Sequence, residues 1–364
     1  MTLSQNMASE HKIVLMPGDG IGPDVLHQGV RVLEKVSAKY GYSFVYEECL
    51  IGGIAYDSVG TPLPDKTVES CVNADAVLLG AVGGPQWDHI EVKHRPEQGL
   101  LGIRKALGLY ANIRPVIVYP ELADASPIKN EIVSNTDLVV VRELLGGIYF
   151  GKRDTIDDYA YDTCEYNKDE IERIIRFAAN LANNRRKKLT SVDKHNVLDT
   201  SRLWRNTCEH LIRQEFPDLD LEHMYIDAAT MHLITKPSYF DVLVMDNMFG
   251  DILSDETSVL SGSMGLLPSA SLNESKNGIY EPIHGSAPDI VGKDIANPIA
   301  SILSVAMMLD YSFEYIDAAQ DIRNAVAHAI TQGHRTVDIA RSSDQKPLKS
   351  DRKSTPSELQ SPCN

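Results

Sequence analysis

Two acidic residues, Asp251 and Asp255, stand four positions apart in a stretch that could bind a metal ion. The apolar run 242–245 before them predicts a short buried strand, and an Asn-x-x-Gly turn then leads into a helix. Residues four apart share one helical face, where two carboxylates repel unless a cation lies between them. Because oxygen ligands favour hard ions, this spacing indicates Mg²⁺ or Mn²⁺. A solvated acidic helix start, favoured by the helix dipole, is the alternative.

Three arginines in separate segments could bind carboxylates. Arg104 lies in the expected helix 95–105, Arg114 precedes a proline, and Arg142 ends the apolar run 139–141. An unpaired buried charge is very costly, so an arginine at the end of a buried strand needs an acid or a ligand. The planar guanidinium group binds carboxylates through two parallel hydrogen bonds. Each arginine alone could be structural, but with the two aspartates they suggest a polycarboxylate chelated to a metal.

Tyr149 and Lys194 are candidates for proton transfer. Tyr149 lies between glycines in the segment 146–151, and Lys194 follows the strand-like run 189–192. Both groups have reference pKa values near ~10, so each needs a nearby cation, or the other group, to work near neutral pH. Ordinary exposure to solvent is the alternative for either residue taken alone.

A loop shaped by glycine and proline, residues 281–297, could hold an adenosine. It contains His284, small residues and Asp289, whose carboxylate could bind ribose hydroxyls and repel a 2′-phosphate. Seen alone, the segment is only a long loop. The glycine-rich segment 18–22 reads GxGxG and lacks the third glycine of the GxGxxG pattern, so we reject a Rossmann fold and expect a tight strand-to-helix turn there.

The elements that must position these groups follow a βα rhythm, which predicts a largely parallel sheet covered by helices. Short apolar runs predict strands at residues 12–16, 44–47, 76–81, 116–119, 138–141, 189–192 and 242–245. Apolar periodicity predicts helices at residues 24–40, 168–186, 301–309 and 317–331. The segment 154–165 carries two tyrosines and several acids, and predicts an exposed hairpin arm, either a loose loop or an arm exchanged between subunits.

Composition narrows the class of protein. A chain of 364 residues, 43% hydrophobic and 24% charged, is typical of a soluble enzyme with about two domains. No apolar run approaches the ~20 residues of a membrane span, and residues 1–12 contain no apolar signal core, so we expect a cytoplasmic protein. The net charge of −16 disfavours nucleic acid and anionic membranes as partners. Five scattered cysteines without CxxC spacing argue against disulfides and a zinc site.

Four motifs make the chain resemble the isocitrate/isopropylmalate β-decarboxylating dehydrogenase family, over about residues 12–340. They are GDGIGP at 18–23, PEQGLLGIRK at 96–105, NMFGDILSDE at 247–256 and HGSAPDI at 284–290. The resemblance implies an α/β fold of two domains, with a large mixed sheet flanked by helices. A first, cofactor-side domain would combine residues 1–109 with 262–341. A second domain, 110–261, would carry the dimer contacts, the metal side and the arm 152–167, and residues 342–364 would form an atypical polar tail.

The same resemblance implies an activity. It is the NAD-dependent oxidative decarboxylation of (2R,3S)-3-isopropylmalate to 2-oxoisocaproate and CO₂ in leucine biosynthesis, with Mg²⁺ or Mn²⁺. It also implies a homodimer with shared active sites, in which each subunit contributes its Lys194 and Asp227 to the active site of its neighbour. Asp289-Ile290 stands where NADP-dependent relatives carry Lys-Tyr, which implies NAD.

The family's functional positions fall on specific residues of this chain. The resemblance gives the catalytic role to Tyr149 and Lys194, and the metal to Asp227, Asp251 and Asp255. The residues implied for substrate binding are Glu97, Leu100, Leu101, Arg104, Arg114, Arg142 and Asp227. The residues implied for cofactor binding are Ile21, Gly84, Glu97, His284, Gly285, Ser286, Ala287, Asp289, Ile290, Ala296, Asn297 and Asp338.

Two departures from the family pattern adjoin the catalytic pair: His195 stands where alanine is usual, and Leu145 where threonine is common. Other functions also stay open. A sibling enzyme would act on malate, tartrate or homoisocitrate, a binding protein would sense a metabolite without turnover, and the carboxylates alone would suit a metal-dependent phosphate-ester hydrolase. A proton-transfer pair argues against mere binding.

Overall fold

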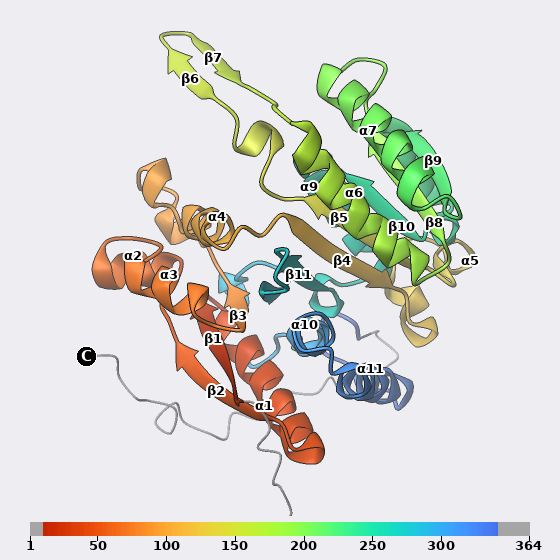
Figure 1. Ribbon diagram of the computed structural model, residues 1–364. Helices are drawn as coiled ribbons and strands as arrows, with labels where there is room; N and C mark the ends of the chain where they lie inside the picture. Colours follow the sequence, from red (N-terminus) through yellow and green to blue (C-terminus); the bar gives the residue numbers. More distant parts are fainter. Residues whose placement is uncertain (1–9, 341–364) are drawn as a thin grey trace, which may run out of the picture.

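One mixed sheet of ten strands organises the protein (Figure 1). The computed structural model describes residues 10–340, so the tail predicted at 342–364 lies outside the described residues. From one edge to the other, the strands of the sheet are β2 (Ser43–Glu48), β1 (Glu10–Gly18), β3 (Ala76–Ala81), β12 (Gly278–Pro282), β11 (Pro268–Leu272), β4 (Ala111–Ile117), β5 (Asp137–Glu143), β10 (Val242–Met245), β8 (Lys188–Asp193) and β9 (Asp220–Tyr225).

The direction of the strands changes at the centre of the sheet. β11 is antiparallel to β12 and to β4, and β4 is antiparallel to β5, whereas the outer pairs are parallel. The mixed sheet implied by the family is confirmed, and so is the largely parallel sheet predicted from the βα rhythm, since six of the nine strand pairs are parallel. The antiparallel pairing of β11 with β12 follows from their short connection, which has room for a hairpin turn and not for a crossover helix.

Helices cover both faces of this sheet. Their bounds are α1 (Gly22–Tyr40), α2 (Gly53–Val59), α3 (Asp65–Val72), α4 (Pro96–Ala106), α5 (Asn130–Val133), α6 (Lys168–Asn183), α7 (Asp199–Glu215), α8 (Ile226–Thr235), α9 (Asn247–Ser258), α10 (Ile299–Tyr311) and α11 (Ile316–Thr331). On one face, a single apolar cluster runs under α1, α10, α11, α6 and α7. On the other face there are two separate clusters, one under α3 and α4 and one under α8 and α9.

Because β11 pairs with β4, the sheet runs without a break through both halves of the molecule. This pairing coincides with the boundary expected between the domains 1–109 plus 262–341 and 110–261, so the division into two domains stays a prediction. The expected strands 76–81 and 242–245 match β3 and β10. The strand expected at 116–119 was wrong in position, since β4 spans Ala111–Ile117 and places polar residues inside the sheet.

The expected hairpin arm is present. β6 (Arg153–Ile156) and β7 (Tyr159–Asp162) form a two-stranded antiparallel sheet in which every residue is exposed. Figure 1 shows this hairpin projecting away from the ten-stranded sheet. The four cysteines within residues 10–340 are free thiols. In that same part of the chain, we find no helix with the length and apolar character needed to span a membrane.

Candidate active site

A strip of polar side chains crosses the sheet between the two smaller apolar clusters. Side chains alternate along a strand, so Asn112 and Arg114 of β4 face away from the neighbouring Ile113, which belongs to the continuous cluster. The fully buried Asn112 donates through Nδ2 to the hydroxyls of Ser269 (2.9 Å) and Ser271 (3.0 Å) on β11. Its Oδ1 accepts from Arg114 Nε at 3.0 Å. Asn112 therefore sets the direction in which Arg114 leaves the sheet.

Helix α9 supplies acids to two of the arginines. Arg114 donates to Asp255 Oδ1 (3.0 Å) and to Ser254 Oγ (2.8 Å). Arg142, at the end of β5, forms an ion pair with Asp251, which confirms that the two aspartates share the helical face turned toward the arginines. Burial lowers the pKa of both guanidinium groups, that of Arg142 to about 10, while the aspartates oppose the change. Arg142 therefore stays charged at neutral pH.

The third arginine is held from the other half of the sheet. Arg104, near the end of α4, donates through Nη2 to Glu281 Oε1 of β12 at 2.7 Å, and both side chains are buried. The buried Nε of Arg104 has no hydrogen-bond partner among the described residues. An unsatisfied buried donor is costly, so this N–H is suited to an anionic ligand. Earlier in α4, Leu100 packs against the apolar cluster beneath, and Leu101 is half-buried.

Tyr149 belongs to the same network. Its hydroxyl donates to Asp251 Oδ2 at 2.7 Å, and the Arg142 guanidinium carbon lies 5.5 Å from the centre of its ring. Burial raises the pKa of Tyr149 to about 12, and the hydrogen bond to Asp251 adds to that effect. The phenol is therefore protonated across the neutral range, which is the state that a proton donor needs.

Lys194 and Asp227 form a separate pair. Lys194 follows directly after β8, Asp227 lies in the first turn of α8, and Lys194 Nζ is 2.5 Å from Asp227 Oδ1. This hydrogen bond lowers the pKa of Asp227. The backbone beside Lys194 is fixed by Asp193, which accepts from His195 N (2.9 Å) and forms two hydrogen bonds with Arg205 (2.8 and 2.7 Å).

The predicted metal ligands are not all together within one chain. Asp251 and Asp255 lie on one face of α9, whereas Asp227 is engaged by Lys194. Across residues 10–340, no three or more His, Cys, Asp or Glu side chains are grouped so that they could hold a metal ion. A complete set would therefore need a further ligand from outside this chain, such as water, substrate or a second subunit.

The residues predicted for the cofactor lie around two loops. Ser286 accepts from Ile21 N through its carbonyl (2.8 Å) and donates through Oγ to the carbonyl of Gly83 (2.6 Å). Asn297 Nδ2 donates to Asp338 Oδ2 at 3.0 Å. Burial lowers the pKa of His284, whose buried Nε2 has no hydrogen-bond partner among the described residues.

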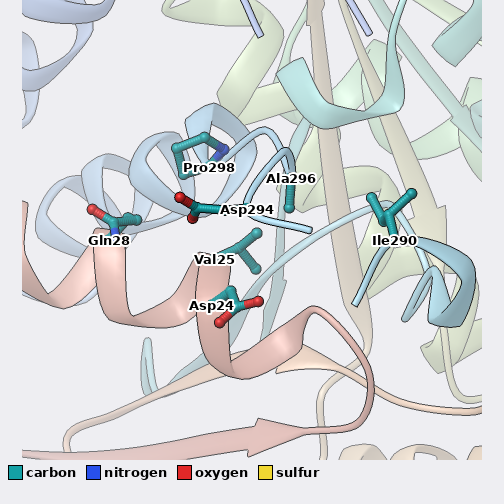
Figure 2. Close-up of a pocket in the computed structure, with 7 residues that line it drawn as sticks. All are labelled: Asp24, Val25, Gln28, Ile290, Asp294, Ala296 and Pro298. Atoms are coloured by element: carbon teal, nitrogen blue, oxygen red, sulfur yellow. The ribbon is translucent and has the colours of Figure 1, made fainter. Parts of the chain in front are cut away.

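The other predicted cofactor residues differ in exposure. Gly285 and Asp289 are exposed, and Ala287 takes a left-handed conformation (φ +40°) before the short turn at 288–290. Ile290 and Ala296 line a small pocket against Asp24, Val25 and Gln28 of α1, which Figure 2 shows. Gly84 precedes a short turn at 85–87, and the Glu97 carboxylate lies close to Gly83.

Several residues of the network were not predicted as site residues from the sequence. Glu281 pairs with Arg104, Asn112 and Ser254 bind Arg114, and Asn247 accepts from Arg142 Nε at 2.9 Å. The signal for Asn112 was available, because it lies two residues from Arg114 in a strand and so shares its face. Nothing local pointed to Glu281, which is 177 residues from its partner.

Comparison with known proteins identifies the family. Residues 12–355 match the family model described as isocitrate/isopropylmalate dehydrogenase. The chain is 53% identical to the 3-isopropylmalate dehydrogenase of Clostridium pasteurianum over 335 residues, covering 91% of this chain and 94% of that protein. It is 55% identical to the 3-isopropylmalate dehydrogenase of Xanthomonas euvesicatoria over 336 residues, covering 90% and 93%.

Solved structures agree with this match. The isocitrate dehydrogenase of Methylococcus capsulatus has a TM-score of 0.81 at 36% identity, covering 93% of this chain and 96% of that one. A β-decarboxylating dehydrogenase of Thermococcus kodakarensis has a TM-score of 0.76 at 34% identity, covering 92% of each chain. The fold is thus that of a decarboxylating dehydrogenase. The chain belongs to the isocitrate/isopropylmalate dehydrogenase family.

The acid that begins α9 generates a prediction about pH and stability. Asp246 caps this helix, because its Oδ1 accepts from Phe249 N at 2.8 Å. Burial raises the pKa of Asp246 to about 6, above its value in an unfolded chain. The folded state therefore keeps the proton until about pH 6 and bears the cost of a buried charge at higher pH.

We predict that Asp246→Asn stabilises the protein at pH 8 by about 1–2 kcal/mol and by about half as much at pH 5. Asparagine keeps the oxygen that caps the helix and removes the charge. Urea unfolding at both pH values measures the difference, and Asp218→Asn, which changes an exposed acid, is the control. An equal shift at the two pH values would contradict the prediction.

Proposed function

We propose that the chain oxidises and decarboxylates (2R,3S)-3-isopropylmalate with NAD⁺, giving 2-oxoisocaproate and CO₂ for leucine biosynthesis. The observation that carries the proposal is the cluster of three charged arginines that meets Tyr149 and the α9 acids on one face of the sheet. The relatives that are more than half identical over most of their length carry the name of this activity. Isocitrate dehydrogenases are similar in structure and less identical in sequence.

The arginines suit a substrate with two carboxylates. Arg104, Arg114 and Arg142 present N–H groups whose charge is now balanced by acids, and the Arg104 Nε is unsatisfied. A carboxylate can accept two hydrogen bonds from one guanidinium group. In α4, Leu100 and Leu101 add apolar surface beside Arg104, which fits an isopropyl group better than the extra carboxylate of isocitrate. Glu97 completes the part of the helix that would read the substrate side chain.

The acids fit a hard divalent ion. Asp251 and Asp255 are 38% and 71% exposed at their side chains, so their oxygens are accessible as well as paired with arginines. Carboxylate oxygens are the ligands that Mg²⁺ and Mn²⁺ prefer, and Asp227 of a second subunit would add another. When bound, the ion would supply Lewis-acid polarisation of the substrate hydroxyl oxygen. The same acids would then bind the arginines less tightly, which leaves guanidinium N–H groups for the substrate.

Two side chains would move protons. Lys194, with Asp227 beside it, would assist loss of the proton from the substrate hydroxyl, while the carbon that carries this hydroxyl gives up hydride to NAD⁺. Loss of CO₂ then leaves an enolate, and Tyr149, which is protonated at neutral pH, would donate a proton to its carbon. Arg142 and Asp251 hold the phenol in place for that transfer.

The cofactor would lie along two loops, the loop 281–297 and the segment from Gly84 to Glu97. The His284 ring has an Nε2 without a hydrogen-bond partner among the described residues, which could meet the adenine, and Asp289 is exposed in the same loop for the ribose hydroxyls. The segment from Gly84 to Glu97 would meet the nicotinamide. An acid at 289 repels the extra phosphate of NADP⁺, so NAD⁺ is the cofactor we propose.

A homodimer would complete the site. Helices α8 and α9, with the residue that follows α9, leave apolar side chains exposed to solvent in this chain: Met231 (60%), Ile234 (48%), Ile252 (54%) and Val259 (47%). The arm exposes Ile156, Tyr159 and Tyr161 as well. Exposed apolar surface of this kind is typical of an interface. Because Asp227 lies on α8 and Asp251 on α9, a dimer packed through these helices would bring Lys194 and Asp227 of one subunit to Tyr149 of the other.

We predict metal-dependent production of NADH from isopropylmalate, faster than from isocitrate, malate or tartrate. A chelator should abolish it and Mg²⁺ or Mn²⁺ should restore it. Asp251→Asn should lower kcat/KM by at least ~10²-fold, because it removes an acid from the metal and from Arg142 and Tyr149. Asp169→Asn, in an exposed first turn of α6, is the control. Full activity in chelator would exclude a role for the metal. A faster reaction with another of these acids would make that acid the preferred substrate in place of isopropylmalate.

We predict that the active sites are shared between subunits. Lys194→Ala and Tyr149→Phe should each lose about 10²–10⁴-fold in kcat, the scale of acid–base catalysis. If Lys194 serves the partner's site, a mixed dimer of the two variants keeps one intact site and one doubly damaged site. Mixing the variants should thus restore up to half of the activity per mixed dimer. No recovery, despite subunit exchange shown by mass spectrometry, would place both residues in one chain's site.

We predict that Asp289-Ile290→Lys-Tyr reverses the cofactor preference. The lysine would attract the 2′-phosphate that Asp289 repels, so kcat/KM should fall for NAD⁺ and rise for NADP⁺. Asp218→Asn, which removes an exposed negative charge outside this loop, serves as the control. Equal losses with both cofactors would show that Asp289 only shapes the turn.

A further inference from the structure

Asp19 is a buried acid to which the proposed mechanism gives no role. It is 3% exposed and lies in the turn between β1 and α1. Its carboxylate accepts three backbone hydrogen bonds from two separate segments: Oδ2 accepts from Gly53 N and Gly83 N, and Oδ1 accepts from Ile54 N, each at 2.8 Å. A carboxylate that gathers N–H groups from outside its own turn holds those segments at a fixed separation.

The segment 83–87, here called the Gly83 loop, is fixed at both ends. At Gly83 the N–H is bound by Asp19 (2.8 Å) and the carbonyl by Ser286 Oγ (2.6 Å). At the other end, Trp87 packs so closely on α2 that a Cβ at Gly53 would lie 2.2 Å from its ring. Gly83 has a φ of +102°, a conformation that other residues rarely adopt.

The Gly83 loop lies between the part of the proposed site that would bind the substrate and the part that would bind the adenosine. On one side, a Cβ at Gly83 would be 2.9 Å from Glu97 Oε1, on the helix that carries Arg104. On the other side, Ser286 joins the loop to the segment with His284 and Asp289. Hydride passes directly from a substrate carbon to the nicotinamide, so the nicotinamide must lie on the substrate side of the adenosine. That position is beside the Gly83 loop.

We propose that Asp19 is a positioning residue for the nicotinamide half of the cofactor, because its carboxylate fixes the Gly83 loop against the start of α2. The inference rests on the proposed function and adds a residue that does not touch the reacting atoms. Loss of the carboxylate frees the Gly83 N–H and loosens the wall of the nicotinamide site. The adenosine loop keeps its own contacts, such as the bond from Asn297 to Asp338.

The test compares two ligands on the full-length protein. NADH contains both halves of the cofactor, whereas ADP-ribose lacks the nicotinamide. For Asp19→Asn, which keeps the size of the side chain and replaces one acceptor oxygen by a donor, calorimetry should show a Kd for NADH raised about tenfold or more. The Kd for ADP-ribose should stay within about twofold of wild type, and KM for NAD⁺ should rise more than kcat falls.

Asp57→Asn is the matched control. Asp57 is close to Asp19 and accepts from Trp87 Nε1 at 3.1 Å through an oxygen that asparagine retains, so both Kd values should be unchanged. If Asp19→Asn does not fold by circular dichroism, Gly83→Ala perturbs the same loop from its other side and should give the same split between the ligands.

Equal weakening of NADH and ADP-ribose, or a Kd for NADH within twofold of wild type, would overturn the role of Asp19. If the wild-type protein binds neither ligand, the proposed function fails and this inference fails with it. Binding of both ligands by the wild type, without the expected split in the variants, leaves the proposed function intact and removes only the positioning role.

Discussion

Three positive charges on one buried face of a sheet are the constraint around which this molecule is arranged. An arginine removed from water must have an acid within reach, and the acids come from two distant elements: Glu281 from β12, and Asp255 and Asp251 from α9. The polar strip of Asn112 and the β11 serines then separates the two apolar clusters on this face. The active site is thus the place where the core is interrupted.

The same acids have two possible partners, and this gives the site its chemistry. Within this chain, Asp251 and Asp255 neutralise arginines, and Asp251 also fixes the Tyr149 hydroxyl. A divalent ion would compete for these oxygens and a dicarboxylate for the guanidinium groups, so both ligands would exchange charges that are already paired. Such an exchange avoids an uncompensated buried charge at any stage. Asn112 and Asn247, being neutral, hold the arginines in place throughout.

Local sequence was enough for some parts of this structure and not for others. The strands at 76–81 and 242–245 are wholly apolar and were placed correctly, and the aspartate spacing of α9 gave the shared face. β11 reads Pro-Ser-Ala-Ser-Leu, which has no strand signal. Its serines are buried because Asn112 of the adjacent strand β4 binds their hydroxyls, and the local sequence does not show that contact. The bond between Arg104 and Glu281 is likewise set by strand order. The apolar faces of α8 and α9 are visible only once the chain is folded.

Trp87 makes one loop of this protein observable by light. The chain contains two tryptophans, and they differ in their surroundings. Trp204 is 2% exposed within α7, with its N–H bound to Ser191 Oγ at 3.1 Å. Trp87 is 7% exposed and rests on Gly53 of α2, within the connection 82–95 between β3 and α4. Any shift of that segment changes the polarity around one indole and leaves the other as a constant background, so intrinsic fluorescence follows this loop without an added label.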